Sequence, residues 1–542
     1  MICKNTPEKS IILLVSRLFK KANQRISLGN AAALLIVASM LGQLLGFLRT
    51  KLVNANFSAL GPDSTDAYFA AFKIPDLFYF TLAAGALGVA FMPFLADRLV
   101  KNDRKGIWEL SNSLLNLLAV VMFFVGIIIL LFAEELIHYI VAPNMSPEQL
   151  HNASTIMRLV AFNPLLFTIS GILTSVQQVF GRFFFFAIAP LFYNVCIILS
   201  IYFFKDNIGL IGLGVGALAG ALIQLFVALG GFIGLGYSYK HVINFNNREF
   251  KQILRQLPPR SIDQGIDSIN SIAETNFARR LGEGNVSYFE NAYTLQMAPT
   301  LLVGTTIATA AFPRLNDRLA QNRSDLFRRD FLQILRLIFW IIMPVAIIGY
   351  FARGYLARLI FSRDSPEIAL ILGFFVGAIV FRTIYVIVSR WFYSQKDTKT
   401  PLFVSLFAII LNVILAFNLA KASAYGVAGL AMAQSIVAFA EVLILMTIMV
   451  KRDRKLLDID FWDGIARIIA VSGFTVIATF AVISIYPLEV GDKGFFVLGS
   501  KLAIISSVAF LTHLTMSAVF GLSEVQPIVR KLKDIILKPV KI

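Results

Sequence analysis

Five charged residues lie inside or beside the first two apolar stretches of the chain: Arg49, Lys51, Asp66, Lys73 and Asp76. Hydrocarbon solvates a charge poorly, so an ionisable residue within a membrane span is by default a functional candidate. Fixed cations suit a phosphate-bearing ligand, because the planar guanidinium of arginine can pair with two phosphate oxygens at once. We therefore expect a substrate-binding cluster here, in which Arg49 and Lys73 contact the anion.

Structural alternatives remain open for the same side chains. Arg49 and Lys51 lie near the outer end of their stretch, so both could extend to the membrane surface and bind no ligand. Lys73 lies deeper, beside Pro75. Its alternative role is an internal ion pair with Asp66 or Asp76.

A second polar stripe occurs in the middle of the chain. Asp263, Asp267, Asn270 and Glu274 recur at the spacing of one helical face, and Arg279 and Arg280 follow them. A stripe facing lipid would be costly, so it should face a cavity or another helix. It could bind a headgroup, through Glu274, Arg279 and Arg280, or a coupling cation, through Asp263 and Asp267. The alternative is that Asp263 caps the helix and the others form a buried polar network.

Two further arginines, Arg382 and Arg390, are eight residues apart in a later apolar stretch and should point in similar directions. They are added to the predicted substrate-binding set. Pairing with Glu441 or Glu290 would give them a structural role instead.

The composition identifies the class of protein that must position these residues. The chain has 542 residues, of which 57% are hydrophobic and 15% charged, against roughly 45–50% and 25% in soluble domains. The net charge of +17 is divided among loops between apolar stretches, which argues against a nucleic-acid partner. Two separated cysteines and four scattered histidines predict neither disulfides nor a metal site, and no nucleotide-binding motif or catalytic constellation occurs.

Crossing a bilayer takes about 20 apolar residues, and fourteen stretches approach that length. We predict an all-α polytopic protein with two six-helix lobes and two further helices. The predicted spans lie near 30–54, 67–95, 110–132, 155–180, 185–204, 208–236, 261–281, 286–312, 332–351, 367–395, 401–420, 425–450, 464–486 and 495–521.

The distribution of positive charge predicts the orientation. The tail before residue 29, the loops at 97–108, 237–260, 313–329 and 451–455, and the tail after residue 521 are rich in Lys and Arg. Both termini should therefore be cytoplasmic. The predicted parts are a basic tail (1–28), an N-lobe (29–236), a basic amphipathic linker lying on anionic lipid (237–260), a C-lobe (261–450), two last spans (451–521) and a basic tail (522–542).

The two lobes share short sequence blocks. Tyr68-Phe69 recurs as Tyr288-Phe289, Pro93 as Pro313, and Asp97-Arg98-Leu99 as Asp317-Arg318-Leu319, all 220 positions later. Pro190-Leu191-Phe192 recurs as Pro401-Leu402-Phe403, and Gly214-Val215 as Gly426-Val427. An even number of spans per repeat predicts parallel halves, as in transporters built from two repeats.

These blocks resemble the MurJ (MviN) family, flippases of lipid-linked peptidoglycan precursor within the multidrug/oligosaccharidyl-lipid/polysaccharide exporter superfamily. The resemblance covers almost the whole chain. It is carried by Gly46-Phe47-Leu48-Arg49, Thr65-Asp66-Ala67-Tyr68-Phe69, Ala71-Phe72-Lys73-Ile74-Pro75, Gly85-Ala86, Ala90-Phe91-Met92-Pro93, Phe392-Tyr393-Ser394 and Asp397-Thr398-Lys399-Thr400-Pro401.

The resemblance implies a MATE-like fold with a cationic central cavity that alternates its opening, and a groove for a lipid tail at the last two helices. It implies a bacterial inner-membrane flippase for undecaprenyl-diphosphate-linked peptidoglycan precursor, which is not an enzyme. It also makes Asp267 (or Asp263) with Asp397 a pair for a monovalent cation, so Na⁺, H⁺ or the membrane potential would drive transport. We expect a monomer, anionic lipids around it and cell-wall synthesis proteins as partners.

The chain also departs from the family pattern. Gln43, Tyr79, Phe80 and Thr294 stand where the family usually has cavity arginines, so only Arg49 is retained. Three alternatives therefore stay open: export of another lipid-linked oligosaccharide or a cationic compound, a transport-dead scaffold, or a glycosyltransferase of such lipids. The last needs a large outer loop, and the longest, 132–154, is short.

Overall fold

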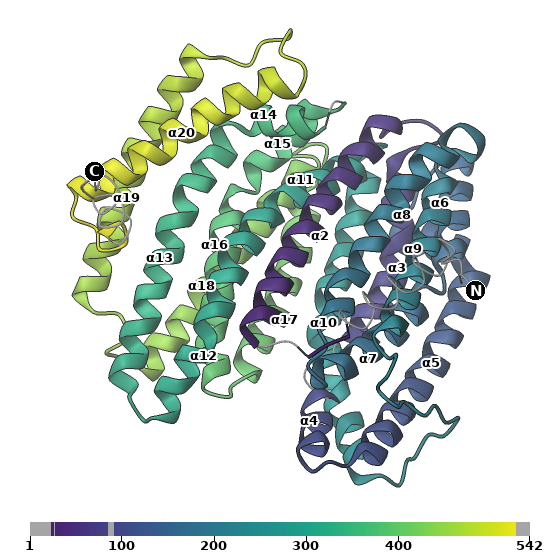
Figure 1. Ribbon diagram of the computed structural model, residues 1–542. Coiled ribbons are helices and arrows are strands. Elements are labelled where there is room, and N and C mark those ends of the chain that lie inside the picture. Colours follow the sequence, from purple (N-terminus) through teal and green to yellow (C-terminus); the bar gives the residue numbers. More distant parts are fainter. Residues whose placement is uncertain (1–22, 26–27, 85–90, 362, 527–542) are drawn as a thin grey trace, which may run out of the picture. The chain divides into compact units, whose positions relative to one another are not determined.

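The computed structural model describes residues 23–25, 28–84, 91–361 and 363–526, and all regular structure within these ranges is helical (Figure 1). The predicted fold class is confirmed. Twelve helices in the described part are long and apolar enough to cross a membrane, so the predicted number of fourteen is not reproduced.

The chain forms two compact units, residues 1–286 and 287–542. The helices of the first unit are α2 (Leu28–Asn56), α3 (Thr65–Phe78), η1 (Tyr79–Ala84), α4 (Met92–Val100), α5 (Arg104–Glu135), η3 (Leu136–Val141), α6 (Pro147–Val160), α7 (Asn163–Val179), α8 (Phe184–Ile208), α9 (Ile211–Gly230) and α10 (Arg248–Arg280).

Helix α11 (Asn285–Pro299) begins at the boundary and leads into the second unit. Its other helices are η4 (Thr300–Thr305), α12 (Thr306–Ala320), α13 (Ser324–Phe351), α14 (Arg353–Ile360), α15 (Ser365–Phe374), α16 (Val376–Ser394), α17 (Lys399–Leu419), α18 (Ala428–Arg452), α19 (Ile459–Ile485) and α20 (Phe495–Val519).

The sequence repeat is also a repeat of local structure. Asn102 after α4 and Asn322 after α12 both adopt the left-handed region, with φ of 58° and 56°, which asparagine tolerates better than most residues. Their amides donate to the carbonyls of Leu99 and Leu319, 3.0 Å away in both cases. The π-helical segments η1 and η4 begin 221 positions apart, at Tyr79 and Thr300. The two units therefore share a substructure, and not only an apolar composition.

Some predicted boundaries differ from the observed ones. The predicted spans 155–180 and 367–395 are each interrupted, giving α6 with α7 and α15 with α16. No separate interfacial helix forms in the predicted linker: residues 235–244 lack regular structure, and α10 continues unbroken from Arg248 to Arg280. Helix α10 belongs to the first compact unit.

Close packing explains why α10 belongs to the first unit. Its Gly265 lies against η1, where a Cβ atom would come within 2.4 Å of the Thr81 hydroxyl oxygen. The absence of a side chain lets the two helices approach closely, as small residues commonly do between membrane helices.

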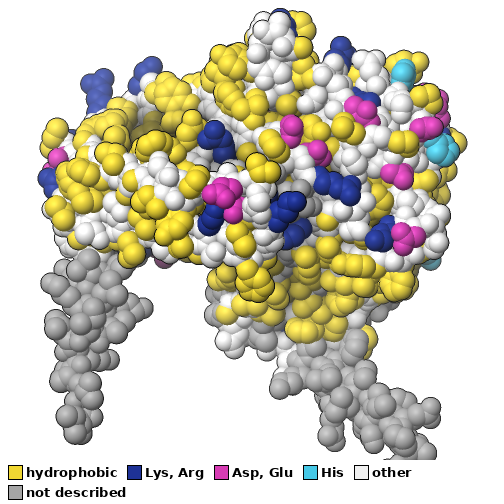
Figure 2. Space-filling view, turned by 90° about the horizontal axis from the view of Figure 1, so that it is seen from above, with side chains coloured by type: hydrophobic (Ala, Val, Ile, Leu, Met, Phe, Trp, Pro, Cys, Tyr) yellow, Lys and Arg dark blue, Asp and Glu magenta, His cyan; other side chains and the backbone are white. Residues whose placement is uncertain are grey.

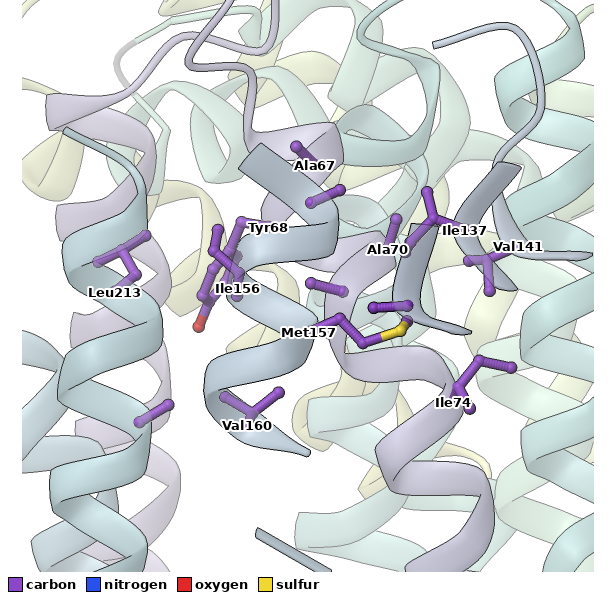
Figure 3. Close-up of a cluster of buried hydrophobic side chains, with 14 of the residues drawn as sticks. Ala67, Tyr68, Ala70, Ile74, Ile137, Val141, Ile156, Met157, Val160 and Leu213 are labelled. Atoms are coloured by element: carbon purple, nitrogen blue, oxygen red, sulfur yellow. The ribbon is translucent and has the colours of Figure 1, made fainter. Parts of the chain in front are cut away.

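The core of the first unit is built on α3. Ala67, Ala70 and Ala71 have no exposed surface, and Tyr68 and Ile74 pack beside them. Figure 3 shows α3 facing η3, α6 and α9, which contribute Ile137, Val141, Ile156, Met157, Val160 and Leu213. Small residues on α3 thus hold the polar residues of the same helix in fixed positions.

Large apolar side chains remain exposed on many helices, as a hydrocarbon environment requires. Examples are Leu44 of α2 (64% exposed), Phe124 of α5 (59%), Phe403 of α17 (66%) and Ile477 of α19 (67%). In the view of Figure 2, charged side chains and histidines lie among broad areas of apolar side chains.

Candidate functional site

Arg49 is one of the two cations of α2, and it is half-buried. Within the described residues its guanidinium forms no hydrogen bond and no ion pair. Helix α2, which carries it, packs against α8. An arginine in a membrane span without a carboxylate partner retains its full capacity to bind an anion.

A small pocket in the first unit is bordered by Tyr193 of α8. Asp76, Tyr79 and Asn163 also line the pocket, whose volume of about 10 Å³ suits one water molecule. The side chain of Asn163 is only 3% exposed, and it lines this pocket together with Tyr193. Buried amides need hydrogen-bond partners, which a water molecule in the pocket would supply. Sequence reasoning missed Asn163, because a single asparagine before a proline gives no distinctive signal.

Lys73 is engaged within the first unit. Its ammonium donates to the hydroxyl of Ser271 on α10 across 2.6 Å. Lys51 is half-buried on α2, and Asp76 is exposed on α3. Both have interactions of their own within the structure.

Asp66 and Arg279 form a buried ion pair. Their side chains are 0% and 5% exposed, and the guanidinium lies 3.2 Å from the carboxylate. The same carboxylate accepts from the amide of Gly284 at 2.8 Å, and Arg279 also donates to the amide oxygen of Gln149 at 2.7 Å. Glu283 accepts from the Gly61 amide and from Gln149, so the cluster connects α3, α6 and the end of α10. This geometry favours a structural role for Asp66 and Arg279 over direct contact with a substrate.

The polar face of α10 divides into two parts. Asn270 and Glu274 are buried, and the Asn270 amide donates to the Glu274 carboxylate at 3.0 Å. Asp267 is exposed, and Arg280, also exposed, donates to Asn276. The side chain of Asp263 lies outside the described residues.

The two arginines of α16 have different surroundings. Arg382 approaches the amide oxygen of Gln434 on α18 at 3.4 Å and has further partners. Arg390 lies over the rings of Phe312 and Tyr393, 5.1 and 6.0 Å from their centres. It forms no ion pair within the described part of the chain. Aromatic faces attract a guanidinium without neutralising it, so Arg390 remains available to an anion.

Asp397 lies in the turn before α17. Its carboxylate accepts from the amides of Lys399 and Thr400 at 3.0 Å, from the Thr400 hydroxyl at 2.6 Å, and from Arg452 at 2.7 Å. Burial raises the pKa of Asp397, but the hydrogen bonds from Thr400 and Arg452 outweigh it and lower the pKa to about 2. The Arg452 guanidinium thus occupies one side of the carboxylate, and a role of Asp397 in cation coupling stays a prediction. The described residues contain no group of three carboxylate, histidine or cysteine side chains able to hold a metal ion.

Comparison with known protein families gives one match across most of the chain. The model for the family described as lipid II flippase MurJ matches residues 58–506. The chain belongs to the MurJ family. It is accordingly a multi-pass bacterial membrane protein.

Two relatives of the same family share a low sequence identity with this chain, but the matches extend over most of both proteins. The chain is 22% identical to the probable lipid II flippase MurJ of Borreliella burgdorferi over 78% of this chain and 83% of the relative. It is 24% identical to the probable lipid II flippase MurJ of Rhizobium meliloti, over 82% and 85%.

Solved structures share the fold. A lipid II flippase MurJ in an inward closed conformation superposes with a TM-score of 0.76 at 21% identity, covering 90% of this chain and 98% of that one. An inward-facing MATE family multidrug transporter of the MOP superfamily gives 0.64 at 17% identity, covering 80% and 98%.

Four positions that usually carry arginine in the MurJ family supply no cation here. Gln43 is exposed on α2, Tyr79 stacks edge-on against Phe167, and the hydroxyl of Thr294 donates to its own helix. Phe80 is exposed. Arg49, which forms no ion pair with another described residue, is therefore the arginine of the family pattern that this chain retains.

Proposed function

We propose that the protein is a flippase that moves lipid II, the undecaprenyl-diphosphate-linked peptidoglycan precursor, across the bacterial cytoplasmic membrane. Membership of the MurJ family supports the activity. The observation that carries the proposal within this chain is Arg49, a half-buried cation of α2 without a carboxylate partner among the described residues.

Arg49 would bind the diphosphate. A guanidinium can donate two parallel hydrogen bonds to phosphate oxygens, which compensates for the water that the charged headgroup loses. Lys73 would add a second positive charge, held in place by its hydrogen bond to Ser271. The lipid tail would remain in hydrocarbon throughout. No bond is made or broken, so the process is transport by alternating access and not enzymatic chemistry.

The energy would come from an ion gradient or from the membrane potential. One elementary charge moved through 100 mV supplies about 2.3 kcal/mol, a bias of about fiftyfold. Asp397 with a pKa of about 2 does not exchange protons near neutral pH, so a proton would have to use another group. Asp267, exposed on α10, is the better candidate for cation coupling.

The positive-inside rule supports an orientation with both termini and the basic loops on the cytoplasmic side, and the protein would act there as a monomer. Newly flipped precursor would be used by cell-wall synthesis proteins on the outer side.

Complementation tests the function directly. A strain depleted of its lipid II flippase would receive the wild-type protein, Arg49→Ala, Arg49→Lys, or Arg158→Ala as a control at a partly exposed arginine that pairs with Glu134. We expect rescue by the wild type and the control, none by Arg49→Ala and partial rescue by Arg49→Lys, which keeps the charge without the bidentate geometry. Rescue by Arg49→Ala at equal membrane abundance would remove Arg49 from the mechanism.

A second candidate function is export of a different lipid-linked oligosaccharide or of a cationic compound. It is favoured by the uncharged residues at Gln43 and Tyr79 and by the exposed carboxylates of Asp76 and Asp267. Failure of well-expressed wild type to rescue the strain would support this candidate, or a scaffold, over lipid II transport.

A further inference from the structure

An arginine-lined pocket lies in the first unit, apart from Arg49. It has a volume of about 200 Å³ and is bordered by Asn23, Arg25, Arg104, Phe180, Arg182 and the turn at Gly234-Leu235. These residues come from four separate segments of the chain. Three guanidinium groups meeting at one pocket repel one another unless an anion is present.

The local sequence fixes Arg182 at this pocket. Helix α7 ends at Val179, and Gly181 follows in the left-handed region with φ of 78°. This conformation lets the amide of Arg182 donate to the carbonyl of Gln177 at 2.9 Å, which closes the helix end. The side chain of Arg25 lies against Gly181, whose Cβ would be 3.6 Å from the Arg25 Cγ.

One edge of the Arg182 guanidinium is already held. Its Nη1 donates to the amide oxygen of Asn23 at 3.2 Å and to the carbonyls of Gly231 and Ile233 at 3.1 and 2.8 Å. Its Nε and Nη2 form no hydrogen bond with described residues. Those two nitrogens form the edge that pairs with two oxygens of a phosphate. The group is therefore oriented before any ligand arrives.

The nearby carboxylates are committed elsewhere. Asp103 and Glu249 both pair with Arg98, at 2.8 and 2.6 Å, and Asp103 also caps α5 through the amide of Gly106. Within the described residues, Arg25, Arg104 and Arg182 form no ion pair. Burial, and then the charge of Arg25, lower the pKa of Arg182, as expected for cations that lack a counter-charge.

In the equivalent turn of the second unit, the residue at the position of Arg182 has its charge neutralised by an ion pair. Asp397 occupies the position 215 residues after Arg182, where its amide donates to the carbonyl of Phe392 at 3.0 Å in the same helix-closing pattern. There the acid pairs with Arg452 at the end of α18. In the first unit an arginine occupies this position and bonds carbonyls after α9, so its charge is not cancelled.

We propose that the pocket formed by Arg25, Arg104 and Arg182 is a binding site for a phosphate anion, either the headgroup of an anionic phospholipid or free inorganic phosphate. Its volume is below the ~300–1,000 Å³ of pockets that enclose drug-sized ligands, which suits a headgroup. The basic loops around it are those that the positive-inside rule assigns to the cytoplasmic face, where anionic lipids are available. Occupancy would anchor α7, α8 and the loop after α9 to the membrane surface.

Binding can be measured on the full-length protein in an uncharged detergent. The probes are dioctanoyl phosphatidylglycerol, dioctanoylglycerol, which lacks the phosphate, and inorganic phosphate as a competitor. Trp108 is a local reporter because its ring stacks on Phe180 at 5.6 Å. Native mass spectrometry of the same samples counts bound lipid, and Trp108→Phe tests the origin of the fluorescence signal.

The key variant is Arg25→Gln/Arg104→Gln, since both residues are exposed and neither forms an ion pair with another described residue. Its matched control, Arg454→Gln/Lys455→Gln, removes the same charge from another basic loop. We expect the first variant to weaken phosphatidylglycerol binding by about tenfold or more and the control by less than about twofold. Arg182→Lys keeps the charge but loses the planar guanidinium that donates two parallel hydrogen bonds, so it should also weaken phosphatidylglycerol binding.

The competition identifies the source of the phosphate. Displacement of phosphatidylglycerol by inorganic phosphate would support a site open to soluble anions, and lack of displacement would support a lipid headgroup. Equal binding of dioctanoylglycerol, or an equal loss in the control variant, would overturn the proposal. The result is independent of lipid II transport, because complementation by Arg49 variants involves none of these three arginines.

Discussion

Breaking the buried pair of Asp66 and Arg279 should destabilise the first unit. Removing one member of a buried ion pair typically costs 3–5 kcal/mol, because the other charge is left uncompensated. Asp66→Leu leaves Arg279 with Gln149 and the carbonyl of Asn144, so we expect a loss of about 3 kcal/mol in the free energy of unfolding. Arg279→Met leaves the fully buried carboxylate with the Gly284 amide, so we expect about 5 kcal/mol.

The double variant makes this prediction decisive. Asp66→Leu/Arg279→Met leaves neither charge. The free energy of unfolding that it loses should therefore be about 2–3 kcal/mol smaller than the sum of the losses in the two single variants. The measurement is equilibrium unfolding of the purified protein in mixed micelles. Asp463→Asn is the matched control, because its pair with Arg467 is about half exposed and should contribute only about 0.2–0.5 kcal/mol. Additive single losses, or a single loss as small as that of the control, would refute the buried-pair reasoning.

Three further outcomes are expected. Asp397→Ala removes the carboxylate that accepts from the Lys399 and Thr400 amides at the start of α17, and it should lower the free energy of unfolding by about 1–2 kcal/mol near neutral pH. Because the folded pKa of about 2 lies below the ordinary value of about 3.9, that difference should shrink as pH falls from 5 towards 2, and a constant difference would contradict it. Gly429→Ala should cost about 1–3 kcal/mol, since its Cβ would lie 2.3 Å from the Leu419 carbonyl oxygen. Gly473→Ala, with open space around it, is the control and should be neutral or slightly stabilising in the same unfolding assay. His513→Ala removes the contacts of α20 with Thr475 and the Trp340 carbonyl, both at 3.1 Å, and should cost about 1–3 kcal/mol. Unchanged protease resistance of α20 in His513→Ala would count against that role.

The sequence determined the class of protein and its repeat, because both depend on local properties. Apolar length and charge position follow from the chemistry of the bilayer, which acts on each segment separately. The blocks around Asp97 and Asp317 could be recognised by comparison within the chain, and the turns that follow them form the same backbone hydrogen bonds. Arg49 was found as a candidate because a charge in an apolar stretch is visible in the sequence.

Only the tertiary structure decided which charges are paired. Asp66 and Arg279 lie 213 positions apart, so nothing local indicates that they neutralise each other. The stripe on α10 has one helical spacing, yet Asn270 is buried and Asp267 exposed, because neighbouring helices cover only part of that face. Which charges pair depends on which helices pack together, and only the tertiary structure determines this. The ability to cross the membrane depends on the apolar length of each segment, which the sequence shows directly.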